Sequence, residues 1–98
     1  MQAEHPPGSR IMVVDDNPAN VDALLDQLLS VGFEVIVAQD GEEALELIQY
    51  NVPDLILLDV VLPGIDGFET CRRLKADNRT SAIPVIFLTS CVALRWER

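Results

Sequence analysis

Two stretches, Ile11-Met12-Val13-Val14-Asp15-Asp16 and Leu55-Ile56-Leu57-Leu58-Asp59, decide the fold of this 98-residue chain. Each is a short, unbroken apolar run that ends in aspartate, and such runs are typical of parallel strands covered on both faces. Helix-start residues follow each run, so we expect the two strands to point the same way. Their carboxyl ends then meet at one edge of the sheet, where ligands bind in open parallel sheets. Three carboxylates gathered at that edge repel one another unless a hard cation or a shared proton relieves them.

Strand and helix signals alternate along the chain. Apolar runs predict four strands, at residues 10–14, 33–38, 54–58 and 83–88. The capping residues Asn17, Asp40 and Asp66, each followed by apolar residues at helical spacing, predict three helices, at residues 18–31, 41–50 and 67–76. Gly32 is placed to end the first of them. An alternation of this kind predicts an α/β fold with a parallel sheet and helices on both faces.

Composition sets further bounds on the protein. Residues 1–9 are predicted to form a flexible leader, and residues 10–98 a single domain. The net charge of −9, with only seven Lys and Arg residues, argues against nucleic-acid binding. No stretch has the pattern of a signal peptide or a membrane span. Two cysteines are too few for a disulfide framework, so we expect reduced thiols and a cytoplasmic protein.

Three stretches in order, at residues 13–17, 57–67 and 84–90, resemble the receiver domain of two-component response regulators. The Asp-x-x-x-Pro-Gly-x-Asp-Gly pattern that begins at Asp59 is the most specific of them. The resemblance implies a doubly wound, flavodoxin-like topology with strand order 2-1-3-4. It also implies a role in phosphorelay signal transduction, with a sensor histidine kinase or a His-phosphotransfer protein as partner.

The resemblance assigns a role to each candidate site residue. Asp59 is the expected phosphoacceptor, and a carboxylate attacks phosphorus well when it is ionised and aligned. Asp16 is expected to bind Mg²⁺ (or Mn²⁺) directly and Asp15 to hold the ion through water. The backbone carbonyl of Val61 is expected to supply a further oxygen. Thr89 is the expected hydroxyl that bonds the phosphoryl group, although a β-branched residue is also common in a strand without any such role.

The sequence departs from the family pattern at its carboxyl end. The family's fifth strand, its last helix and its functional lysine have no counterpart here, so the domain is expected to be incomplete and phosphorylation slow. The alternative is a shortened receiver that acts as a protein-interaction module with little or no phosphorylation. An enzyme is not expected, because aspartate-based phosphatases use a second Asp two residues after the nucleophile and Val61 stands there.

The predicted sheet also has more apolar surface than its three helices cover. The fourth strand is then an unprotected apolar edge. The segment 92–96 fits either a short helix or a strand, and it would cover its own sheet or that of a second copy. The sequence therefore predicts a homodimer formed on the fourth-strand side, with this segment in the contact.

Overall fold

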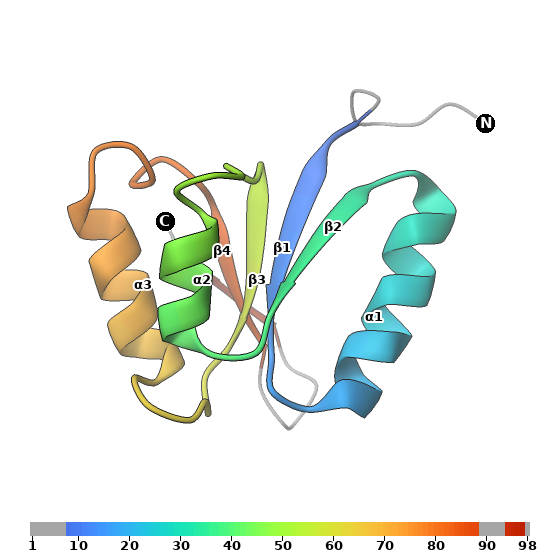
Figure 1. Cartoon of the computed structure of the whole chain (residues 1–98), viewed down its shortest axis with the longest axis horizontal. Helices are drawn as coiled ribbons and strands as arrows, with labels where there is room; N and C mark the ends of the chain where they lie inside the picture. The colour runs from blue at the N-terminus through green and yellow to red at the C-terminus, as the bar shows by residue number, and fades with distance from the viewer. Residues whose placement is uncertain (1–7, 89–93, 98) are drawn as a thin grey trace.

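The computed structural model describes residues 8–88 and, as backbone, residues 94–97 (Figure 1). Its elements follow one another in the order β1 (Arg10–Val14), α1 (Pro18–Val31), β2 (Glu34–Ala38), α2 (Gly41–Leu47), β3 (Leu55–Asp59), α3 (Gly67–Ala76), β4 (Val85–Leu88) and β5 (Leu94–Glu97). They form one sheet of order β2-β1-β3-β4-β5 in which the first four strands are parallel. The predicted α/β class and the 2-1-3-4 order are therefore confirmed. The predicted leader falls largely outside the described residues.

The sheet has a strand that the sequence did not place. β5 pairs antiparallel with β4, with Leu94 opposite Leu88 and Glu97 opposite Val85. The expectation that β4 is an unprotected edge is therefore wrong, and β5 is the outermost strand on that side. The physical reason is that the outer backbone N–H and C=O groups of an edge strand need partners, and a short returning segment supplies them.

The helices begin at the capping residues that the sequence indicated. Asn17 precedes α1 and its side chain accepts from the N–H of Ala19, while Asp40 and Asp66 cap α2 and α3 in the same manner. Gly32 ends α1 at φ 104°, a left-handed conformation that favours glycine. None of the helices in the described part of the chain is long and apolar enough to cross a membrane.

Helix α2 is shorter than predicted. It ends at Leu47 and not near Tyr50, and the backbone continues as turns. The N–H groups of Gln49 and Tyr50 bond to carbonyls three residues back, which tightens the chain before Pro53. Pro53 restricts only Val52, the residue before it, so the chain has already left the helix before the proline acts.

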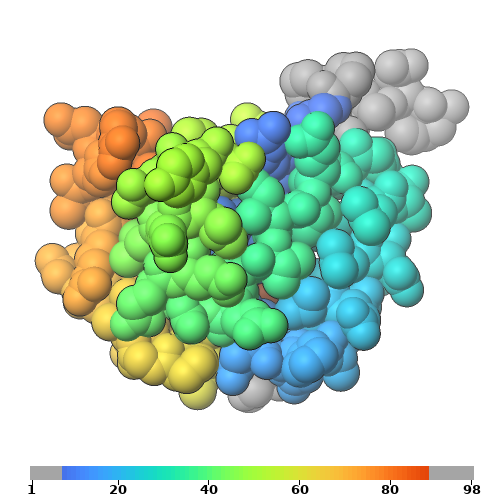
Figure 2. Space-filling model, in the orientation of Figure 1, coloured from blue at the N-terminus to red at the C-terminus, as the bar shows by residue number. Residues whose placement is uncertain are grey.

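Two apolar clusters lie on opposite faces of the sheet. Neighbouring residues of β1 alternate between them, so that Met12 joins the cluster under α2 and α3 and Val13 joins the cluster under α1. Figure 1 shows α1 on one side of the sheet and α2 with α3 on the other. Figure 2 shows the segments of α3, α2 and α1 side by side across the visible face. The parallel pairing of β1 with β3 places the carboxyl ends of these strands next to each other at one edge of the sheet.

Candidate functional site

Three aspartates meet at the carboxyl edge of the sheet. Asp59 ends β3, and Asp15 and Asp16 directly follow β1, which pairs with β3. One carboxylate oxygen from each lies within 4.8 Å of those of the other two. Asp15 is buried, Asp59 is half-buried and Asp16 is exposed, so the group opens to solvent on one side. We call these three residues the acidic cluster; the structure brings them together as expected.

The buried member, Asp15, is held by the start of α1. Its side chain is only 3% exposed. The backbone N–H of Asn17 donates to Oδ1 at 2.9 Å, and the side-chain amide of Asn20 donates to Oδ2 at 3.4 Å. Each oxygen of this carboxylate thus accepts one hydrogen bond from the start of α1.

The charged form of Asp59 is disfavoured in the cluster. Partial burial raises the pKa of Asp59, and the nearby Asp15 carboxylate adds to the rise. The N–H of Val61 opposes it by donating to Oδ1 of Asp59 at 3.3 Å. The ionised nucleophile therefore lies in surroundings that a bound cation would make more favourable.

The loop after Asp59 is fixed by two glycines. Gly64 takes a left-handed φ of 75° and lies beside the Glu42 carboxylate. Gly67, the first residue of α3, donates its N–H to the carbonyl of Val60 at 2.8 Å. A Cβ at Gly67 would overlap the carbonyl oxygen of Asp59, so only glycine allows this approach. Val61 lies in this loop with its side chain 77% exposed.

Within residues 8–88, the basic side chains are engaged with groups other than the acidic cluster. Their ion pairs are Arg10 with Glu34, Arg72 and Arg73 with Glu69, and Arg79 with Asp77. Lys75, the only lysine of the sequence, donates to the carbonyls of Ser81 and Ile83 at the other end of the sheet. In the described part of the chain, no protein cation therefore neutralises the three carboxylates.

The donor set of the cluster fits a hard divalent cation. Carboxylate oxygens are the side-chain ligands that Mg²⁺ prefers, and Mg²⁺ needs only one or two of them because it keeps several waters. The exposed Asp16 and the half-buried Asp59 face the open side of the cluster, where waters fit. Thr89, the expected phosphate-binding hydroxyl, lies outside the described residues.

Two contributors to the site were missed in the sequence. Asn20 was not singled out, although it lies three residues after Asn17 and thus on the same side of α1. Gly67 is the last residue of the Asp-x-x-x-Pro-Gly-x-Asp-Gly pattern, and in the structure it lets α3 begin against the backbone of Asp59. The spacing of Asn20 from Asn17 was a usable signal in the sequence. The role of Gly67 depends on a contact that only the folded chain shows.

Comparison with known proteins identifies the family. Residues 11–94 match the model of the response regulator receiver domain. The response regulator PleD of Caulobacter vibrioides is 49% identical over 82 residues, which are 84% of this chain and 18% of PleD. The protein PilH of Pseudomonas aeruginosa is 40% identical over 82 residues, or 84% of this chain and 68% of PilH.

Solved structures agree with this match. The N-terminal domain of a response regulator receiver protein from Methanoculleus marisnigri superimposes with a TM-score of 0.80 at 44% identity, covering 83% of this chain and 66% of that one. The receiver domain of a sensor histidine kinase from Pseudomonas aeruginosa has a TM-score of 0.81 at 34% identity, over 85% of this chain and 68% of that one. That structure holds a magnesium ion coordinated in its active-site cleft. This chain thus spans about two thirds of the first of these structures and less than a fifth of PleD, and it belongs to the receiver domains of response regulators, which serve two-component signalling.

Proposed function

We propose that this domain accepts a phosphoryl group on Asp59. The observation that carries the proposal is the convergence of Asp15, Asp16 and Asp59 within 4.8 Å at the carboxyl edge of a parallel sheet. Asp59 is the member that ends β3 and begins the specific Asp-x-x-x-Pro-Gly-x-Asp-Gly pattern. This convergence favours a phosphoacceptor over a module used only for protein interaction.

Transfer of the phosphoryl group requires that the Asp59 carboxylate is ionised and aligned with the phosphorus. One oxygen of Asp59 attacks the phosphorus of a phosphohistidine, and an O–P bond forms as the P–N bond breaks. The imidazole nitrogen leaves with the electron pair and takes a proton from water. The N–H of Val61, 3.3 Å from Oδ1 of Asp59, helps to hold that carboxylate in place.

A divalent cation fits this chemistry. Asp16, Asp59 and the carbonyl of Val61 would bind Mg²⁺ or Mn²⁺, and Asp15 would act through water. When bound, the ion offsets the charge of the nucleophile and of the incoming phosphoryl group. The magnesium ion in the similar Pseudomonas aeruginosa receiver domain supports this assignment.

The phosphodonor in this proposal is a sensor histidine kinase or a His-phosphotransfer protein, and the reaction takes place in the cytoplasm. Thr89 follows β4 and would bond a phosphoryl oxygen through its hydroxyl. The choice of phosphodonor and the role of Thr89 are both supported by the match to the receiver family over residues 11–94.

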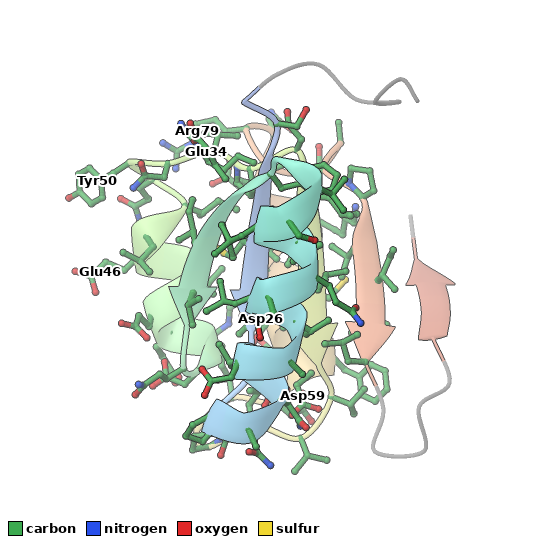
Figure 3. All side chains as sticks on the ribbon, turned by 90° about the vertical axis from the view of Figure 1, so that its right-hand side faces the viewer. Asp26, Glu34, Glu46, Tyr50, Asp59 and Arg79 are labelled. Carbon is green, nitrogen blue, oxygen red and sulfur yellow. The ribbon has the colours of Figure 1, made fainter. Side chains whose placement is uncertain are left out.

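We also propose that two copies of the chain associate. Apolar residues of β3 and β4 lie half-buried on the side of the sheet that carries α1: Leu55, Ile86 and Leu88. Figure 3 shows β4 and β5 beside α1, and none of the described helices lies in front of them. A second copy placed here would remove this apolar surface from water.

Mass spectrometry of the intact 98-residue chain after incubation with acetyl phosphate and Mg²⁺ tests the phosphoacceptor role. We expect one added phosphoryl group, and none on Asp59→Asn. Uptake should be slow, because no basic side chain of the described residues pairs with the cluster. Asp26→Asn, an exposed change on α1, is the matched control and should label like the original chain. Label that survives Asp59→Asn would reject the assignment, and an unlabelled original chain would favour the interaction module.

A further inference from the structure

Asn20 is a polar residue of the first turn of α1 whose side chain is directed at the acidic cluster. Its amide donates to Oδ2 of Asp15 at 3.4 Å, while the backbone N–H of Asn17 donates to Oδ1 at 2.9 Å. The two donors come from the same end of α1 and take one oxygen each. Figure 3 shows that α1 begins at the end of the molecule where Asp59 lies. The start of this helix thus donates one hydrogen bond to each oxygen of the buried Asp15 carboxylate.

A carboxylate in this position needs a second donor. Asp15 is 3% exposed and lies within reach of two other carboxylates. With the Asn17 bond alone, the carboxylate plane could turn about that bond, and repulsion would drive it away from Asp59. A donor on the other oxygen fixes the plane. Groups that orient a ligand in this way raise the affinity of metal sites.

We propose that Asn20 is a positioning residue for divalent-cation binding. Its amide holds the Asp15 carboxylate in the orientation that converges with Asp16 and Asp59, and thereby raises the affinity of the cluster for Mg²⁺. Asn20 itself does not bind the ion. The inference rests on the proposed metal site. It adds that the site needs a hydrogen-bond donor to orient Asp15, which none of the three carboxylates can be.

The competing explanation is that Asn20 is an ordinary surface residue near a helix start. Asn20 is exposed, so its substitution should leave folding intact. A purely structural effect would change the unfolding midpoint of the metal-free protein and would be the same whether or not residue 15 carries a charge. A positioning effect would appear in Mg²⁺ affinity and would depend on the Asp15 carboxylate. The two explanations therefore separate in a double-mutant cycle.

The experiment is calorimetric titration of the 98-residue chain with MgCl₂. The variants are Asn20→Leu, which keeps much of the side-chain shape without its amide, Asn20→Ala as a second truncation, and Gln27→Leu as a control at an exposed site on the same helix. We expect Asn20→Leu and Asn20→Ala to weaken Mg²⁺ binding by about 10-fold, the low end for loss of an orienting partner because the bond is long. Gln27→Leu should bind Mg²⁺ as the original chain does. Unfolding midpoints without metal should be alike for all of them.

The same substitution is then made in an Asp15→Asn background. There, Asn20→Leu should change Mg²⁺ affinity less than 2-fold, since the carboxylate it orients is gone. An equal loss in both backgrounds, or no loss in the original background, overturns the role of Asn20. If the original chain binds no Mg²⁺ at all, the proposed metal site fails first, and this outcome is distinguishable from the other two.

Discussion

The backbone N–H of Gly67 donates to the carbonyl oxygen of Val60 at 2.8 Å, and this bond joins the start of α3 to the residue that follows Asp59. The approach is so close that a Cβ at position 67 would meet the backbone of both Asp59 and Val60. Two elements that are separated in sequence by a loop are thus in direct backbone contact beside the acidic cluster.

Replacement of Gly67 by alanine should therefore destabilise the protein. Alanine favours helices over glycine by up to about 1 kcal/mol, whereas an extra methyl in a filled space costs about 1–3 kcal/mol. The obstacle is backbone and cannot rotate away, so we expect the steric cost to prevail. Urea unfolding should show a lower midpoint, and Mg²⁺ affinity should fall as well. A variant as stable as the original chain would show that α3 shifts freely.

The exposed Asp16 should dominate cation binding. Asp16→Asn removes a ligand oxygen charge, so Mg²⁺ affinity measured by calorimetry should fall by at least about 10-fold. Asp22→Asn removes the same charge from an exposed position on α1 and is the matched control. A similar loss in both variants would point to a general electrostatic effect, and unchanged affinity in Asp16→Asn would remove it from the site.

Glu69 should contribute stability that depends on pH. Hydrogen bonds from Arg72 and then Arg73 lower the pKa of Glu69 from 4.5 to about 2. The folded protein thus holds this carboxylate charged where the unfolded chain would protonate it, so the contribution is full above pH 4.5 and is lost as pH falls toward 2. Thermal unfolding should show Glu69→Gln less stable at pH 7. The difference in unfolding temperature between the original chain and Glu69→Gln should disappear as the pH falls. It should also shrink in high salt, because the ion pairs are exposed.

A gap for Glu69→Gln that stays constant between pH 5 and pH 3 would contradict this assignment of the ion pairs. The comparison is specific because glutamine keeps the backbone N–H that Asp66 caps. Loss of the helix cap therefore cannot imitate the expected result.

Association of two copies should respond to salt in a characteristic direction. Each copy carries a net charge of −9, so copies repel one another and added salt should strengthen a contact made through apolar side chains. Light scattering at high micromolar concentration should show a dimer, more so at high salt. Ile86→Gln places a polar amide on the half-buried face and should weaken the dimer. A monomer at all salt concentrations would exclude the dimer. An unchanged dimer after truncation at Ser90 would exclude only the segment 92–96 from the contact.

The sequence predicted the layers of this fold because each of its signals is local. The run that ends at Asp59, the glycine at 32 and the caps at Asp40 and Asp66 each act within a few residues, and all of them appear in the structure as expected. The convergence of the acidic cluster followed from parallel strand direction together with the strand order 2-1-3-4, which the resemblance to receiver domains implied and which makes β1 and β3 neighbours.

Other features depend on contacts between distant residues and gave no such signal. The antiparallel pairing of β5 with β4 is decided by which edge is left open, and the segment 94–97 fits more than one conformation by itself. The early end of α2 coincides with the turns at Gln49 and Tyr50, which the helical spacing of the apolar residues does not reveal. The bond from Asn20 to Asp15 needs α1 to start at one particular angle to β1, which spacing suggests but does not determine.

The two faces of the sheet should differ in how readily they open. The cluster under α2 and α3 consists mainly of fully buried residues, whereas most of the apolar side chains around α1 are only half-buried. Backbone amides of α1 should consequently exchange with deuterium sooner than those of α3, through local opening that leaves the rest of the sheet intact. Because α1 starts at the acidic cluster, a ligand bound there would slow this exchange first in the opening turn of the helix. The exchange rate of amides on the less tightly packed face would then indicate whether a ligand occupies the acidic cluster.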